Sequence, residues 1–111
     1  MLRSIAAADV LSSEGISIEV IDPRTLVPLD METIVSSVKK TGRLVTAEDG
    51  VKTSGAGAEI IARTMETAMS YIDDVQRVAC PDIPAPFSPP LQEAYMPGKK
   101  AIVETVKKMM E

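Results

Sequence analysis

The sequence predicts a single α/β domain, a parallel sheet with helices on its faces, and three observations support this. The stretch Arg43–Ala68 reads as a strand, a glycine-rich loop and a helix, which is the unit from which parallel sheets are built. Helical and strand patterns alternate along the chain, giving the order α-β-α-β-α-β-α. A length of 111 residues provides one core, so residues 1–111 form one domain.

The first part of the chain predicts two helices around one strand. In Met1–Ser13, apolar residues recur about every three positions, as on one face of a helix. Ile16–Asp22 has an apolar face at every second position, which is typical of a strand. Asp30 is a favourable N-cap for a helix at 31–40, and Gly42 is expected to end it.

The loop at Glu48–Gly57 follows a strand at Arg43–Ala47 and precedes a helix that begins at Ala58. Two interpretations are open: a structural turn, or a site where backbone amides hold an anion. The loop lacks the Gly-Lys-Ser/Thr of a P-loop and the third glycine of a dinucleotide fingerprint, which favours a structural turn. Its glycines are Gly50, Gly55 and Gly57.

The last part of the chain predicts a strand and a terminal helix separated by a proline-rich segment. Gln76–Cys80 reads as the strand, after a polar turn at 73–74. Pro81–Pro90 holds five prolines and should be extended, with Ile83 and Phe87 held on the domain surface or on a partner. A final helix is expected at 97–110.

Composition excludes several function classes. The net charge of −4 argues against nucleic acid as a partner, and no apolar run is long enough to cross a bilayer. The absence of histidine excludes histidine acid–base catalysis and histidine metal sites within this chain. A lone cysteine fits a reducing compartment, so we expect a cytoplasmic location.

An acidic group and a single cysteine are the candidates for chemistry in this chain. Glu48, Asp49 and Glu59 could hold a hard cation, but the positions between them do not follow a calcium-loop pattern, which favours solvated charge. Glu48 also follows the carboxyl end of a predicted strand, where open α/β sheets bind ligands. Cys80 ends another predicted strand and is expected to be a buried, unreactive thiol.

Three motifs, in order and together covering most of the chain, resemble one family. They are EVIDPRTLVPLD at Glu19–Asp30, GAGAEI at Gly55–Ile60 and PDIPAPFSPPLQEAYMP at Pro81–Pro97. The chain resembles the C-terminal domain of the beta subunit of the decarboxylating component of 2-oxo-acid dehydrogenase complexes (pyruvate, branched-chain 2-oxo-acid and acetoin dehydrogenases). That domain is similar to the transketolase C-terminal domain, and the resemblance implies a three-layer α/β/α fold with a mostly parallel sheet.

The resemblance also implies an oxidoreductase component that is inactive alone. Thiamine diphosphate and magnesium belong to the whole enzyme, so no catalytic, cofactor or metal residue is expected in this chain. The implied partners are an alpha subunit, a second beta subunit and the peripheral subunit-binding domain of the acyltransferase core. The implied docking positions are Asp73 or Asp74 together with Glu111, although a solvated turn explains the first two equally well.

One departure from the family lies at the start of the chain. The family domain has a central strand directly before the first helix, between the strands matched by Ile16–Asp22 and Arg43–Ala47. This chain starts at the helix, so we expect a fragment of a larger beta subunit whose neighbouring strands lack a partner. Low stability of the isolated chain follows, and a sharp two-state melt of the monomer would contradict it.

Two further hypotheses are open. A free-standing α/β domain could hold an anionic metabolite at the glycine loop as a binding or regulatory module. Transketolase-like transfer would share the fold but not the segment PDIPAPFSPP. The substrate pocket of the resembled enzymes is outside this chain, so no particular 2-oxo acid is implied.

Overall fold

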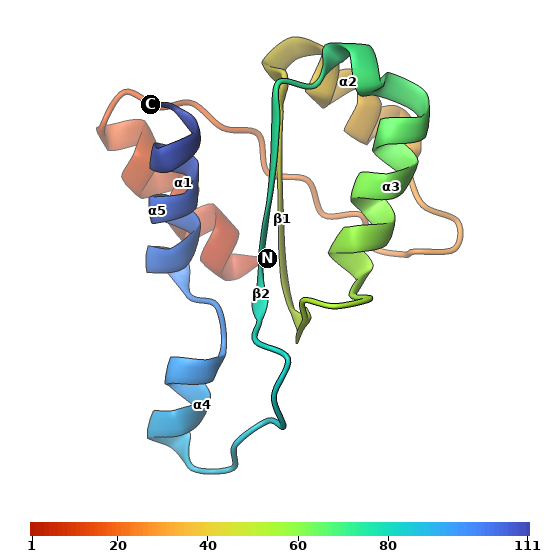
Figure 1. Ribbon diagram of the computed structural model, residues 1–111. Helices are drawn as coiled ribbons and strands as arrows, with labels where there is room; N and C mark the ends of the chain where they lie inside the picture. The colour runs from red at the N-terminus through yellow and green to blue at the C-terminus, as the bar shows by residue number, and fades with distance from the viewer.

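The computed structural model describes residues 1–111 and contains two β-strands, five α-helices and one short 3-10 helix (Figure 1). In chain order these are α1 (Leu2–Ser13), α2 (Met31–Thr41), β1 (Arg43–Val51), α3 (Ala56–Ala68), η1 (Met69–Tyr71), β2 (Asp74–Cys80), α4 (Pro89–Tyr95) and α5 (Lys99–Met109). None of the helices is long and apolar enough to span a membrane.

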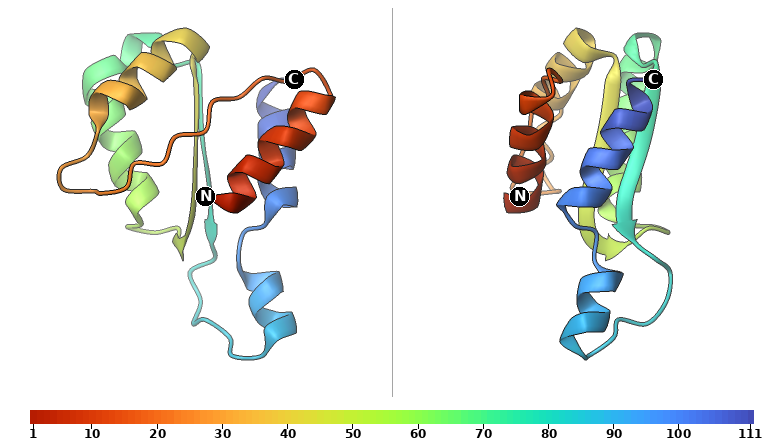
Figure 2. Two further views of the ribbon diagram at one scale, coloured as in Figure 1. Left: turned by 180° about the vertical axis from the view of Figure 1, so that it is seen from behind. Right: turned by 90° about the vertical axis from the view of Figure 1, so that its left-hand side faces the viewer.

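The elements form three layers, as the sequence predicts. β1 and β2 pair in parallel in the middle layer, with Arg43 opposite Asp74 and Ala47 opposite Val78. Figures 1 and 2 show α1 and α5 on one side of this pair and α2 and α3 on the other. The predicted α/β class and helix-covered parallel sheet are therefore confirmed, although the sheet has two strands.

The core is divided into two clusters by the sheet. The first lies between α1, α5 and β2, and the second lies between α2, α3 and Leu29, which precedes the N-cap of α2. Each cluster buries few large side chains, because the sheet between the two clusters has only two strands. The first cluster is Ala7, Leu11, Val78, Ile102, Val103 and Val106, and the second is Leu29, Ile34, Val38 and Ala68.

The predicted strand at Ile16–Asp22 is wrong in one respect: the segment is extended but belongs to no sheet. A strand is defined by hydrogen bonds to a neighbour, and residues 17–22 form no backbone hydrogen bond. Glu19 instead pairs with Lys40 of α2, which lowers the pKa of the Glu19 carboxyl. The alternating side chains still behave as a strand's do, since Ile18 packs on the first cluster and Ile21 on the second.

Several boundaries also differ from the prediction. β1 continues to Val51, so Glu48 lies within a strand and not in the loop. Asp74 begins β2 and does not belong to a turn, because its backbone pairs with Arg43. The last helix begins after its N-cap Gly98, two residues later than predicted.

The proline-rich segment after β2 projects away from the body of the domain, followed by α4 (Figures 1 and 2). Its start is anchored by Asp82, which accepts hydrogen bonds from the backbone and hydroxyl of Thr53, and these bonds lower the pKa of Asp82. Phe87 is 95% exposed and Ile83 is 57% exposed, so the expectation that they are held on the domain surface is wrong. Contact with a partner stays a prediction.

The two ends of α2 confirm the predicted signals. Asp30 Oδ1 accepts a hydrogen bond of 3.1 Å from the backbone amide of Thr33, so Asp30 is the N-cap. Gly42 adopts φ of 72°, the left-handed conformation that glycine reaches without strain. These local signals depend on neighbours within four residues, which is why the sequence reveals them.

Removal of the cap is expected to destabilise α2 in a pH-dependent manner. Hydrogen bonds from Thr33 lower the pKa of Asp30, so its contribution is present above the unfolded pKa of about 4 and is lost as pH falls through the lower folded value. Asp30→Ala should therefore lower the urea midpoint at pH 7. Asp30→Asn, which keeps an accepting oxygen, should preserve most of it. Equal midpoints for the two variants would contradict this role.

Candidate functional site

The glycine loop is closed by a side chain of the same domain. Glu48 Oε1 accepts a hydrogen bond of 3.1 Å from the amide of Gly57, in the first turn of α3. A carboxylate at this position satisfies one free amide and complements the positive end of the helix dipole. An anionic ligand there would meet the charge of Glu48, so the arrangement disfavours the anion-binding interpretation.

Two of the three loop glycines are required by close packing. A Cβ on Gly55 would lie 2.5 Å from the carbonyl oxygen of Val51, and a Cβ on Gly57 would lie 2.5 Å from Thr46 Oγ1. Side-chain carbons do not approach oxygen so closely, so this packing favours a structural role for these two glycines. Gly50 differs, because a Cβ there would meet only Glu48 Oε2 at an ordinary 3.5 Å.

The acidic group around the loop is dispersed. Glu48 faces Gly57, whereas Asp49 Oδ1 lies 3.5 Å from an Arg3 nitrogen at the start of α1. No set of three or more cysteine or acidic side chains comes together in a way that could hold a metal ion. The amide of Gly57 is already bonded to Glu48, and no cluster of oxygen ligands is present. The residues of this chain therefore do not fit a site for thiamine diphosphate and magnesium.

Thr46 is a feature that the sequence analysis missed. Its side chain is 92% buried beside Gly57, yet Oγ1 has no hydrogen-bond partner. A buried hydroxyl without a partner is costly, so one in a native domain calls for an explanation. A threonine in a strand gives no signal in a sequence, because threonine is a common strand residue.

Cys80 is fully buried at the end of β2, as predicted. Its Sγ donates to the backbone oxygen of Asp49 over 3.1 Å. Burial, followed by the charge of Asp49, raises the pKa of the thiol. The thiol is therefore protonated at neutral pH, and the nearby negative charge of Asp49 disfavours the thiolate.

Cys80 should react far more slowly with Ellman's reagent in the native chain than in 6 M urea. The raised pKa reduces the thiolate fraction at pH 7–8, and full burial prevents contact with the reagent. The rate is followed by absorbance, with glutathione as the reference thiol. A native rate equal to that of glutathione would show that Cys80 is exposed and activated.

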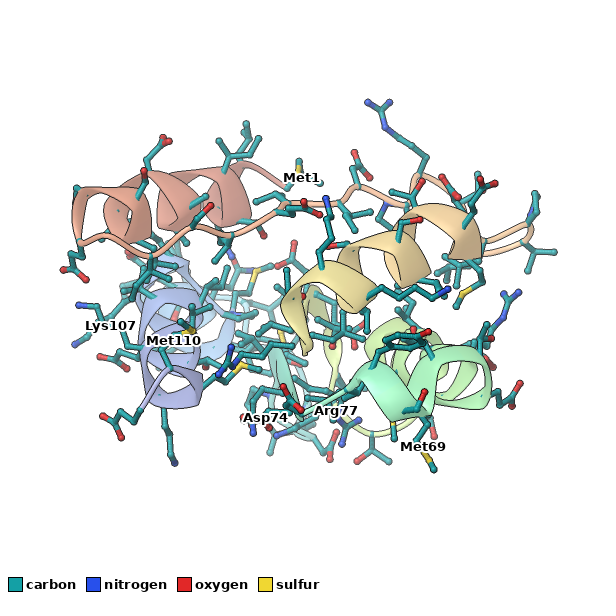
Figure 3. All side chains as sticks on the ribbon, turned by 90° about the horizontal axis from the view of Figure 1, so that it is seen from above. Met1, Met69, Asp74, Arg77, Lys107 and Met110 are labelled. Carbon is teal, nitrogen blue, oxygen red and sulfur yellow. The ribbon has the colours of Figure 1, made fainter.

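The predicted docking residues lie at one end of the domain. The C-terminus and the start of β2 are at the same end in both Figures 1 and 2, and Figure 3 views that end with Asp74 labelled. The backbone amide of Asp73 donates to the oxygen of Gly42 over 2.7 Å, and Asp74 Oδ1 accepts from Gln76. Glu111 follows α5 and is exposed. The structure brings these three acids to one end but shows no contact among them.

The fold and the closed loop define a three-layer α/β domain with a parallel sheet. The family described as the C-terminal domain of transketolase matches residues 1–102, and the chain belongs to that family. The resemblance drawn from the three motifs is confirmed as well. The chain is 46% identical over 106 residues to "Pyruvate dehydrogenase E1 component subunit beta, mitochondrial" of Dictyostelium discoideum.

Bacterial relatives show the same similarity. The chain is 42% identical over 108 residues to the pyruvate dehydrogenase E1 component subunit beta of Rhizobium meliloti and 40% identical over 110 residues to that of Bacillus subtilis. The alignments to these two relatives and to the Dictyostelium discoideum subunit cover 95–98% of this chain but 24–34% of the relatives. The chain therefore spans about a third or less of the length of the relatives that it matches.

Proposed function

We propose that this domain serves assembly and partner docking in a thiamine diphosphate-dependent 2-oxo-acid dehydrogenase. In that enzyme a 2-oxo acid is oxidatively decarboxylated and the acyl group passes to a lipoyl group. The observation that carries the proposal is the 40–46% identity, over nearly the whole chain, to subunits named pyruvate dehydrogenase E1 component subunit beta. The cytoplasm, or the mitochondrial matrix in a eukaryote, is the corresponding location.

The domain is not catalytic alone in this proposal. The chain has no histidine, Cys80 is buried with a raised pKa, and the start of α3 is closed by Glu48. Thiamine diphosphate and magnesium would then be held elsewhere in the enzyme, because the residues of this chain do not fit them. The contribution of the domain is structural, through the surfaces that it offers to other subunits.

The projecting segment after β2 supports contact with other subunits. Two large apolar side chains in it and one in the following helix α4 are exposed in the isolated chain: Ile83 at 57%, Phe87 at 95% and Leu91 at 60%. Several exposed apolar side chains on a projecting part of a domain are typical of an interface. The alpha subunit and a second beta subunit are the partners that we propose for it.

The end of the domain that carries Asp73, Asp74 and Glu111 is the proposed docking surface for the peripheral subunit-binding domain of the acyltransferase core. Asp73, Asp74 and Glu111 place negative charge at this end, where a basic helical module would be attracted and oriented. Such contacts are screened by salt, with a Debye length of about 8 Å at physiological ionic strength. Binding should therefore weaken as salt is added.

Calorimetric titration with a purified peripheral subunit-binding domain tests the proposal. The chain should bind, and the Asp73→Asn/Asp74→Asn double variant should bind more weakly. The control is Asp9→Asn/Glu66→Gln, which makes the same change in net charge on the exposed faces of α1 and α3. An equal loss in both double variants would exclude a docking role for the β2 end. No binding, together with a metabolite that raises the melting temperature, would favour an anion-binding module.

A further inference from the structure

The projecting arm, residues 84–94, is held to the domain only at its two ends. Figures 1 and 2 show the chain leaving the carboxyl end of β2 and returning through α4 to α5. α4 has no buried residue and contributes none to either core cluster. Residues 84–94 form hydrogen bonds only within α4 and with its C-cap, Met96. Neither hydrogen bonds nor core packing therefore fixes the arm along its length.

The outgoing end of the arm is bonded to the loop before α3. Asp82 Oδ1 accepts a hydrogen bond of 3.0 Å from the amide of Thr53, and Asp82 also accepts one from the Thr53 hydroxyl. The amide of Lys52 donates to the carbonyl oxygen of Cys80 over 2.9 Å. Residues 80–82 are therefore part of the body of the domain, and a movement of the arm would begin after Asp82.

The returning end is bonded at Pro97, whose carbonyl oxygen accepts a hydrogen bond of 2.8 Å from Arg3 Nη1. Gly98 follows as the N-cap of α5. A hollow of about 380 Å³ separates this end from β2, and it is lined by residues 77–79 and 81 on one side and by residues 94–98 on the other. The end of α4 is therefore not packed closely on the sheet, which leaves it room to move.

One side chain joins the two ends of the arm. The Tyr95 hydroxyl, in the last turn of α4, donates to the carbonyl oxygen of Ile83 over 3.3 Å. The same hydroxyl lies within hydrogen-bonding reach of the Cys80 thiol. Partial loss of water around the hydroxyl, followed by the charge of the neighbouring Cys80, raises the pKa of Tyr95. Tyr95 thus closes the arm into a loop.

Cys80 lies beneath this closure. Its side chain has no exposed surface, although it stands at the end of β2 where the arm begins. Sγ donates to the backbone oxygen of Asp49, and Tyr95 is the contact that the arm supplies. Movement of Tyr95 away from Cys80 would remove the cover that α4 contributes.

We propose that the arm is a lid, that Tyr95 is the clasp that holds it closed, and that opening of the lid uncovers Cys80. Opening breaks the contacts of Tyr95 with Ile83 and Cys80. The bonds from Thr53 to Asp82 and from Arg3 to Pro97 remain, so both ends stay in place. Because neither core cluster is disrupted, this opening requires much less free energy than unfolding of the domain.

The position of the lid also sets the direction of Phe87 and Leu91, since the arm carries both of these exposed side chains. A partner subunit that binds them would favour one position and so change the accessibility of Cys80. This consequence rests on the proposed function, whereas the lid and its clasp concern the isolated chain. A test on the isolated chain can therefore fail while calorimetric binding succeeds, and the reverse.

The rate at which Ellman's reagent labels Cys80 in increasing urea tests the lid. Well below the unfolding midpoint, labelling of the wild-type chain should be slow and nearly independent of urea, because local opening exposes little surface. Tyr95→Phe keeps the ring and loses the hydroxyl, so the rate should rise about twofold to tenfold, the range for loss of one hydrogen bond. Tyr95→Ala also removes the ring and should label faster still. Sodium sulfate is present throughout, because it stabilises the folded state.

Tyr71→Phe and Tyr71→Ala are the matched controls. Tyr71 is exposed and lies in η1, before the opposite end of β2, so both variants should label at the wild-type rate. A change in thiol acidity cannot imitate the expected result. Burial raises the pKa of Cys80 whereas Tyr95 lowers it, so loss of Tyr95 would by itself reduce the thiolate fraction and slow the labelling.

The urea dependence separates opening of the lid from destabilisation of the whole domain, because labelling through global unfolding accelerates steeply with urea. Three results would overturn the proposal. These are wild-type labelling that follows global unfolding at every urea concentration, a native Cys80 that reacts as fast as glutathione, and Tyr95 variants that label no faster than the Tyr71 variants.

Discussion

Leu11→Ala is expected to lower the free energy of unfolding by about 2–5 kcal/mol, the range for a buried leucine that leaves a cavity. Leu11 has no exposed surface and lies in the cluster that joins α1 to α5. Ala7 is the other fully buried residue of α1, so the attachment of this helix depends on few side chains. Loss of Leu11 should therefore release α1 from the domain.

Chemical denaturation and far-ultraviolet circular dichroism measure this effect. Leu2→Ala is the matched control, because Leu2 lies on the same helix and is 83% exposed. That variant should change stability by no more than about 0.5 kcal/mol, as exposed substitutions usually do. Equal losses in the two variants would contradict the packing of α1 on α5.

The separation of the two clusters gives Leu11→Ala a second signature. The cluster of Leu29, Ile34, Val38 and Ala68 lies on the other side of the sheet and shares no residue with the cluster of Leu11. Amide exchange should therefore accelerate in α1 and α5 before it does so in α2 and α3. Uniform acceleration would show that the sheet couples the two clusters tightly.

Elements with local signals could be predicted from the sequence. The helix after Asp30 is set by apolar spacing, by a cap that bonds three residues on, and by Gly42 in the left-handed conformation. These determinants lie within a few residues of the helix, so the chain itself contains them. Gly55 and Gly57 signal a turn or a close approach in the sequence, but the atoms that they approach belong to β1, which the sequence does not reveal.

Features that depend on distant segments could not be predicted in full. Ile16–Asp22 has the pattern of a strand, but strand formation requires a neighbour, and the adjacent position in the layer is a cavity. Phe87 is apolar, which predicts contact, but its position is set by the path of the projecting arm. The contact from Glu48 to Gly57 likewise depends on how closely α3 approaches β1.

Gly57→Ala is expected to destabilise the domain by about 1–3 kcal/mol, as overpacking of a tight site usually does. The new Cβ would lie 2.5 Å from Thr46 Oγ1 and 3.0 Å from Thr46 Cβ, so α3 or β1 must move. Gly50→Ala is the control, because its Cβ would meet only ordinary contacts. Urea denaturation should separate the two variants, and equal stabilities would show that α3 does not pack so closely on β1.

Thr46→Ala identifies the contact that causes the loss in Gly57→Ala. On its own, Thr46→Ala removes a buried hydroxyl without a partner, so its cost should be small. In the double variant the oxygen at 2.5 Å is gone while Thr46 Cβ at 3.0 Å is replaced by an alanine Cβ, so the loss should be partly recovered. A double-mutant cycle with a coupling energy near zero would exclude Thr46 as the obstacle. Favourable coupling would show that the glycine at position 57 is required by the threonine that β1 places against it, since the first turn of a helix does not itself demand glycine.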